Sequence, residues 1–363
     1  MPVGDAAHQA ITPRISAVSC THTPVVRVAQ GNTSNVKGVE GATLMAAIMI
    51  VDGSAVGYAN QYSHTLTAQG MEVQAISGTL WSLSVLLRTH YDFFPVLAWD
   101  GRAQWRYDLY ADYKSECLKS EASRAARASF ERQRPHIQTM AGKLGLMQLE
   151  APNAETDDVA FQLANVLAAG GHDVLIVTND SDLLQAVGHG IGWFDSRAKK
   201  LIATADDLHD HVGTPDPWTY LQAKALAGDA SDTIEGLPRV GIPTALKVFG
   251  QHGGSIESFY AHVEAGKVDL KKKTLGAIAS AAGRATYERN MKLMDLSRAP
   301  VLRASDVTVS CEPLDEVVFS DWVEHFSLQA ILRNVGQFIE PFIEATRRPG
   351  QRDLEAAIAR LGT

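Results

Sequence analysis

Nine acidic residues are spaced so that their carboxylates could act together. Asp52, Asp100 and Asp180 each follow a short apolar run that is typical of a buried strand, namely AAIMIV, PVLAW and DVLIVTN. The remaining acids begin a predicted helix or lie in a turn: Glu155, Asp157, Asp158, Asp182, Asp229 and Asp232. Because the carboxyl ends of parallel strands meet at one edge of a sheet, the spacing predicts one shared acidic crevice.

Carboxylates that share a crevice need cations. Two unit charges about 4 Å apart repel by about 4 kcal/mol at an effective dielectric constant near 20. Oxygen ligands without paired histidines or cysteines favour Mg²⁺ or Mn²⁺ over zinc. Two groups of acids indicate two ions, the arrangement that hydrolyses a phosphodiester. The alternative is that these acids are helix N-caps and helix-dipole partners. This alternative explains Asp157 or Asp232 alone about as well as a metal site does, but it explains the whole set poorly.

The composition is that of a folded, non-membrane protein. The chain has 363 residues, 45% apolar and 20% charged, and its net charge of −8 argues against a generally basic nucleic-acid coat protein. Cys20, Cys117 and Cys311 are widely separated, so neither a disulfide framework nor a thiolate zinc site is indicated and a cytoplasmic location is expected. The apolar run over residues 42–51 is too short to span a bilayer, and no secretory signal is recognisable.

Four segments follow from the hydrophobic pattern. Residues 1–44 show many turn formers and no period, which predicts a poorly ordered N-terminal extension. Residues 45–216 alternate strands with helices, at 76–90 and 155–169 among others, which predicts a parallel, three-layer α/β domain. Residues 217–300 are expected to form helices and glycine-rich turns without a further strong strand. Residues 301–363 are predicted to be helices that pack on the core.

Two segments have the composition of nucleic-acid contacts. Residues 102–143 contain nine Lys/Arg and five Asp/Glu, a net charge of +4 in an acidic chain. Trp105, Tyr107, Tyr110 and Tyr113 are interleaved with them, which favours contact with a single strand. The alternative is an exposed, salt-bridged helix.

The second segment is the turn EGLPRVGI at residues 235–242. Gly236 and Gly241 would let backbone N–H groups approach a phosphate, and the N-terminus of the following helix would add its dipole. Such contacts bind duplex DNA without reading bases. The alternative is a plain turn between two helices.

Taken together, these motifs resemble those of the 5′ nuclease family, the bacterial and phage 5′-3′ exonucleases and flap endonucleases, similar to the N-terminal domain of DNA polymerase I. The matching segments are IVDGS at 50, AWDG at 98 with YK at 113, ETDD at 155, TNDSDLLQ at 178, GDASDTIEG at 228 and RNMKLM at 289. The resemblance covers residues 45–296. It implies a PIN-like α/β nuclease core within residues 45–216, a helical arch over about 102–145, and a helix–three-turn–helix element within 217–300.

The resemblance also implies roles for individual residues. Asp52, Asp100, Glu155 and Asp157 correspond to the first metal site, and Asp180, Asp182, Asp229 and Asp232 to the second, with Asp158 as an additional acid. Catalysis is expected to depend on Asp100, Asp180 and Lys114. Of these, Lys114 would contact the scissile phosphate. DNA contacts are expected from Arg102, Arg106, Tyr113, Lys114, Gly236, Arg239, Gly241 and Thr244. A K⁺ ion is expected at the hairpin. The implied substrates are DNA with 5′ ends, flaps or nicks, and the RNA of RNA–DNA hybrids, cut by a monomer.

The chain departs from the family pattern at substrate-gripping positions. Ala59 and Cys117 replace arginines, Arg239 replaces a glycine and Pro243 replaces a lysine. The metal set is intact. Two other functions are compatible with parts of the pattern: a non-catalytic, structure-specific DNA-binding protein and a PIN-type ribonuclease.

Overall fold

A seven-stranded sheet forms the centre of the fold, with strand order β11-β5-β4-β1-β6-β7-β8. The computed structural model describes residues 45–115 and 120–363, so the predicted extension at 1–44 and Cys117 lie outside the described residues. The strands are β1 (Ala47–Asp52), β4 (Phe94–Trp99), β5 (Met147–Glu150), β6 (Asp173–Val177), β7 (Ile191–Asp195), β8 (Lys200–Ile202) and β11 (Thr308–Ser310). Two small antiparallel pairs lie outside this sheet: β2 (Thr67–Ala68) with β3 (Met71–Glu72), and β9 (Gly228–Asp229) with β10 (Ile234–Glu235).

The three central strands bring the predicted acids together at the carboxyl ends of the strands. β1 pairs in parallel with β4 on one side and β6 on the other, so that Val51 lies opposite both Leu97 and Val177. The predicted parallel pairing holds from β5 to β7, whereas the outermost strands β8 and β11 run antiparallel to their neighbours. β8 follows β7 through a short hairpin, which only an antiparallel pair allows. β11 is short and exposed, so it carries no hydrophobic period that the sequence could reveal.

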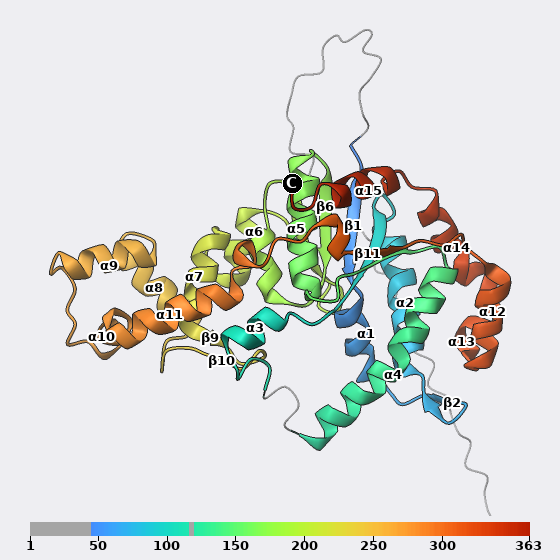
Figure 1. Ribbon diagram of the computed structural model, residues 1–363, viewed down its shortest axis with the longest axis horizontal. Helices are drawn as coiled ribbons and strands as arrows, with labels where there is room; N and C mark the ends of the chain where they lie inside the picture. The colour runs from blue at the N-terminus through green and yellow to red at the C-terminus, as the bar shows by residue number, and fades with distance from the viewer. Residues whose placement is uncertain (1–44, 116–119) are drawn as a thin grey trace, which may run out of the picture. The chain divides into compact units, whose positions relative to one another are not determined.

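Alternate residues of β1 face two different helical layers (Figure 1). Ile48 and Ile50 pack in a core with α5 (Thr156–Ala169) and α15 (Gln351–Ala359). Met49 and Val51 pack in a second core with α2 (Gln74–Thr89), α4 (Glu121–Lys143) and α14 (Val335–Thr346). The α/β prediction is therefore confirmed. The other helices are α1 (Gly53–Gln61), α3 (Gln104–Leu109), α6 (Ala205–Val212), α7 (Pro217–Ala227), α8 (Ile242–Gln251), α9 (Ile256–Glu264), α10 (Lys273–Ala279), α11 (Ala281–Met294), α12 (Glu316–His325) and α13 (Gln329–Leu332), with short 3₁₀ turns η1 (Ser181–Ala186), η2 (Leu296–Arg298) and η3 (Ala304–Asp306).

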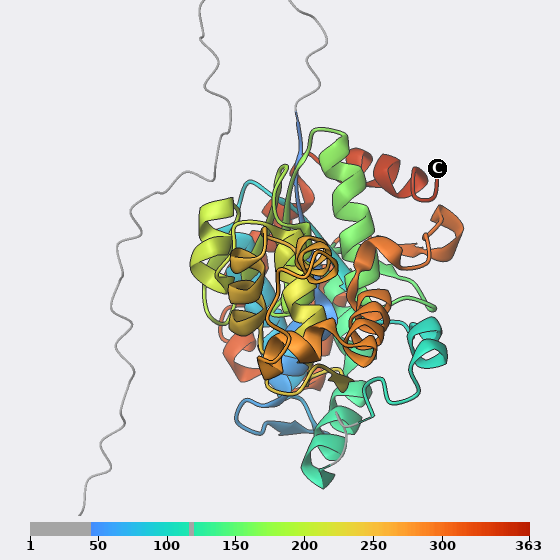
Figure 2. The same ribbon diagram turned by 90° about the vertical axis from the view of Figure 1, so that its left-hand side faces the viewer.

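Helices α7 to α11 lie together beside the sheet and have a core of their own, which includes Phe249 and Phe259 (Figures 1 and 2). α7 packs on η1, the turn that carries Asp182. The C-terminal end of α7 leads directly into Asp229. The backbones at Gly228 and Gly236 cross closely here, since a Cβ added to Gly236 would lie 2.0 Å from the carbonyl oxygen of Ala227. Gly236 is thus required by chain packing. None of the helices in the described parts of the chain is long and apolar enough to cross a membrane.

Candidate metal centre

The predicted strand-end acids lie at the carboxyl edge of β4, β1 and β6, and each is held by backbone or hydroxyl donors. One carboxylate oxygen of Asp52 accepts the N–H of Ala55 at 2.8 Å and the other accepts the Thr178 hydroxyl at 3.0 Å. Asp100 accepts the N–H of Thr156 at 2.9 Å, which joins the end of β4 to the start of α5. Asp180 accepts the N–H of Asp182 at 2.8 Å. Asp52 and Asp180 therefore act as N-caps, and the same bonds orient both carboxylates.

Like charges and burial make ionisation of the carboxyl groups at these strand ends costly. Burial, followed by the charge of Asp100, raises the pKa of Asp52 to about 7. Burial and the charge of Asp182 raise the pKa of Asp180 to about 6, although Lys224 opposes the shift. The pKa of Asp157 is raised by burial and then by Asp180 and Asp52. We call Asp52, Asp100, Asp157 and Asp180 the central acids. They form a site that a cation would stabilise.

Arg106 was expected to contact DNA, and the structure corrects this prediction. Its side chain is only 3% exposed, and it donates to both oxygens of Asp158 at 2.7 and 2.8 Å. It also reaches Glu155 at 3.3 Å and the carbonyl oxygen of Leu293 at 3.2 Å. Burial opposes its charge, but Asp158 outweighs burial and raises the pKa of Arg106. Since both oxygens of Asp158 bind the guanidinium, Asp158 supports Glu155 and is not free to bind a metal in this arrangement.

Tyr113 and Lys114 link two acids that are far apart in the sequence. The Tyr113 hydroxyl lies 2.9 Å from Glu155 and 3.0 Å from Asp232. At 2% exposure Tyr113 is buried, so its predicted DNA contact is also corrected. The Lys114 ammonium lies 2.9 Å from Glu155 and 3.8 Å from Asp232, yet a third of its side chain remains exposed. Lys114 is therefore the cation of this linkage that a substrate can reach.

Asp232 has a different electrostatic setting from its neighbour Asp229. Burial raises the pKa of Asp232 to about 7, with Lys114 opposing and Asp182 reinforcing the shift. Burial also disfavours the charge on Asp229, but the Lys224 ammonium outweighs it and lowers the pKa of Asp229 to about 2.

Lys224 was not among the residues predicted for the site. This α7 residue is 4% exposed, and its ammonium contacts Asp182, lies 2.7 Å from Asp229 and lies 3.1 Å from the Ser181 hydroxyl. The available signal was a lysine in the otherwise apolar helix LQAKALAGD, immediately before an acid of the predicted set.

The donor set fits a divalent cation. All the candidate ligands are oxygens, and those of the central acids repel one another. Within residues 45–115 and 120–363, no group of three or more Asp, Glu, His or Cys side chains is arranged so that it could hold a metal ion. Four of the nine acids are instead paired with basic side chains, since Lys114, Arg106 and Lys224 contact Glu155, Asp158, Asp182 and Asp229.

The remaining predicted DNA contacts are mostly on the surface. Arg102 is exposed and lies over the ring of Tyr107 at 4.4 Å. Arg239 is exposed with a φ of +66°. Gly241 caps α8 and is open, since an added Cβ would meet only Pro243, at 3.9 Å. Thr244, in the first turn of α8, is half-buried.

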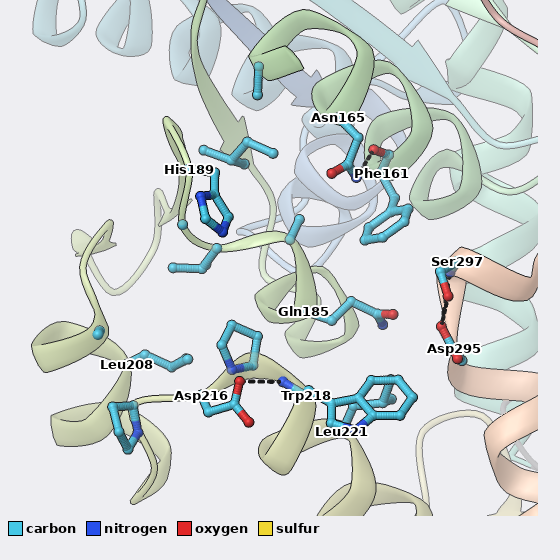
Figure 3. A pocket seen from close by; sticks show the side chains of 18 of the residues that line it. Phe161, Asn165, Gln185, His189, Leu208, Asp216, Trp218, Leu221, Asp295 and Ser297 are labelled. Carbon is cyan, nitrogen blue, oxygen red and sulfur yellow. Dashed lines mark hydrogen bonds between the residues drawn. The ribbon is translucent and has the colours of Figure 1, made fainter. Parts of the chain in front are cut away.

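A separate pocket of about 710 Å³ lies between α5, η1 and the start of α7 (Figure 3). Its wall includes Gln185 and Trp218, and none of the nine acids is among the described residues that line it. Two of its polar groups bond within the wall: Asp216 accepts the N–H of Trp218, and the Ser297 hydroxyl donates to Asp295. The acidic site is therefore distinct from this cavity.

The raised pKa values predict that the metal-free protein loses stability as the pH rises. Asp52 and Asp180 have an ordinary pKa of 3.8 and folded values of about 7 and about 6. Between these limits the folded state binds more protons than the unfolded state, so stability falls through this window and is lowest above it. Thermal unfolding in a chelator should therefore give a lower Tm at about pH 8 than at about pH 5.5. Mg²⁺ should raise the Tm far more at the higher pH. The same increase at both pH values would contradict this account.

Comparison with known proteins gives consistent matches. Residues 47–213 match the family model of the 5′-3′ exonuclease N-terminal resolvase-like domain. The chain is 29% identical over 244 residues to DNA polymerase I of Streptococcus pneumoniae, covering 63% of this chain and 26% of that protein. It is 28% identical over 221 residues to a 5′-3′ exonuclease of Buchnera aphidicola, covering 60% of this chain and 74% of that protein. The chain thus spans about a quarter of the polymerases that it matches.

The fold also has solved counterparts. A bacteriophage T5 flap endonuclease, solved as a pseudo-enzyme–product complex with DNA and metal ions, superposes with a TM-score of 0.59 at 16% identity, covering 83% of this chain and all of that one. These matches confirm the resemblance that the motifs indicated. Residues 47–213 therefore resemble the N-terminal domain of 5′-3′ exonucleases, and the chain is similar to members of the 5′ nuclease family.

Proposed function

We propose that this protein is a metal-dependent 5′ nuclease, a 5′-3′ exonuclease and flap endonuclease that hydrolyses phosphodiesters near the 5′ ends of DNA. The observation that carries the proposal lies at the carboxyl ends of β4, β1 and β6, where burial and like charges raise the pKa values of Asp52, Asp157 and Asp180 beside a partly exposed Lys114. The acids require a cation, and Lys114 offers a positive charge to an anionic substrate.

The acids divide between two ions. We assign Asp52, Asp100, Asp157 and Asp180 to the first ion, and Asp182 and Asp229 to the second. Bound Mg²⁺ or Mn²⁺ would activate a water molecule and neutralise charge on the phosphodiester. Glu155 and Asp232 hold Lys114 through the contacts described above. Asp158 supports Glu155 through Arg106.

Lys114 is the residue that would meet the scissile phosphate. Its backbone N–H bonds to the carbonyl oxygen of Asp232 at 2.8 Å, and its φ of +54° holds the main chain in an unusual conformation. The ammonium is thereby placed next to the acids while remaining accessible. Charge that develops on the phosphate would be stabilised by this preorganised cation.

Residues 217–300 would grip duplex DNA through backbone contacts. The open N-terminus of α8 at Gly241, with Thr244 in its first turn, suits a phosphate, and a K⁺ ion would be held at the same hairpin. Exposed Arg239 and Arg102 would add positive charge.

We assign residues 45–216 to the catalytic domain and residues 301–363 to helices that pack on it. The substrates would be 5′ ends, flaps, nicks and RNA–DNA hybrids, cut by a monomer. Ala59, Cys117, Arg239 and Pro243 change contact positions, so substrate preference is where this chain would differ from its relatives.

The test is cleavage of labelled branched substrates by the unmodified protein. A DNA 5′ flap, a nicked duplex, an RNA 5′ flap and a 3′ flap would each be incubated with Mg²⁺, with Mn²⁺ or with a chelator. Divalent-ion-dependent products from the 5′-ended DNA substrates, and none from the 3′ flap, are expected. Binding of branched DNA without hydrolysis in either ion would favour a non-catalytic DNA-binding protein. Selective cleavage of the RNA flap would favour a PIN-type ribonuclease.

A further inference from the structure

Lys224 lies inside the acidic site rather than at its rim. It belongs to the buried face of α7, between Ala223 and Ala225, which are both fully buried in hydrophobic cores. Its side chain is 5% exposed, and those of its partners Asp182 and Asp229 are 11% and 12% exposed. The ammonium therefore has the Ser181 hydroxyl and these two carboxylates as partners in place of water.

The position of Lys224 makes the two groups of acids electrostatically unequal. A buried ammonium is tolerated only when carboxylates offset its desolvation, and here two of them contact one cation. Burial opposes the charge of Lys224, but Asp182 and Asp229 outweigh it and raise its pKa. The two groups therefore differ in their contacts, because a buried ammonium touches Asp182 and Asp229, whereas no ion pair among the described residues joins a basic side chain to a central acid.

We propose that Lys224 is a built-in counter-cation for Asp182 and Asp229, so that divalent ions bind this protein in two unequal steps. The first ion binds tightly at the central acids. The second binds more weakly, because it must displace the Lys224 ammonium from both carboxylates. The inference rests on the proposed two-ion function and concerns the affinity of its second site. Lys224 is a positioning residue that acts through Asp182 and Asp229.

The test is calorimetric titration of Mn²⁺ into metal-free protein. The wild-type protein should show a tight step followed by a weak one, and Lys224→Gln should tighten the second step by roughly tenfold or more, since it removes a unit charge in contact with both ligands. Lys224→Arg keeps the charge and should keep the weak step. Lys143→Gln is the matched control, because Lys143 also pairs with a carboxylate, Glu312, but lies at the end of α4; both of its steps should match the wild type.

Two further measurements keep the test decisive if Lys224→Gln folds poorly without metal. The double variant Lys224→Gln/Asp229→Asn removes opposite charges together, and it should show no gain in second-step affinity. In the wild-type protein, an amine-acylating reagent followed by peptide mass analysis should label Lys224 slowly without metal. Labelling should increase only at the Mn²⁺ concentrations of the second step.

The outcomes separate the inference from the proposed function. If the second step is unchanged in Lys224→Gln, or if Lys224 labelling does not respond to Mn²⁺, the counter-cation role is wrong even though the first step and DNA cleavage are normal. If the wild-type protein neither binds Mn²⁺ nor cleaves 5′-ended DNA, the proposed nuclease function fails.

Discussion

Replacing Asp52 by Asn should lower kcat for 5′ flap cleavage by about 10³-fold or more while raising the Tm of the metal-free protein. The loss follows from removing a central acid that ends β1 between β4 and β6. The Tm should rise because the Asp52 carboxylate, whose pKa is raised to about 7, is costly to ionise in the folded state at about pH 8. Asn keeps an oxygen that can accept the N–H of Ala55, so α1 should retain its cap.

Opposite changes in activity and stability distinguish a metal ligand from a structural residue. Single-turnover cleavage and thermal unfolding with and without Mg²⁺ would be measured on the same preparations. Mg²⁺ should stabilise Asp52→Asn much less than the wild-type protein. Asp173→Asn is the matched control, because Asp173 is an exposed acid at the opposite end of the neighbouring strand β6; it should change neither property. A variant that loses stability and activity together would argue for a purely structural Asp52.

Replacing Arg106 by Met should lower the free energy of unfolding by about 3–5 kcal/mol, since it leaves buried carboxylates without their counter-charge. The guanidinium joins α3 to the start of α5 and to the end of α11 through Asp158, Glu155 and the carbonyl oxygen of Leu293. Its removal should also release Glu155 from its position beside Lys114. Denaturant unfolding would measure the stability, and single-turnover kinetics would measure the activity.

Two variants separate this buried role from a DNA contact. Arg102→Met, on the exposed side of the same segment, should leave stability unchanged and weaken DNA binding in a salt-dependent manner. Arg106→Met/Asp158→Asn removes the unpaired charge and should recover part of the lost stability. If Arg106→Met is as stable as the wild-type protein and only weakens DNA affinity, the original prediction of a DNA contact is right.

Sequence alone determined the sheet core and the place of the strand-end acids. The runs before Asp52, Asp100 and Asp180 are short, apolar and locally readable, and they become β1, β4 and β6. Parallel pairing then brings the carboxyl ends of these strands together, because neighbouring parallel strands point the same way. The antiparallel edges were not predictable from this pattern, since β8 and β11 are short and partly exposed.

Only the tertiary structure decided which charges meet. Arg106, Tyr113 and Lys224 carry no local mark of their partners, which lie 52 residues away for Asp158, 119 for Asp232 and 42 for Asp182. A basic or aromatic residue on a helix has the same sequence pattern whether it faces solvent or a buried carboxylate. Its role depends on where α3, α5 and α7 pack against the sheet. That packing converts two predicted DNA contacts into supports of the acidic site, and it places in that site a lysine that the acidic pattern did not predict.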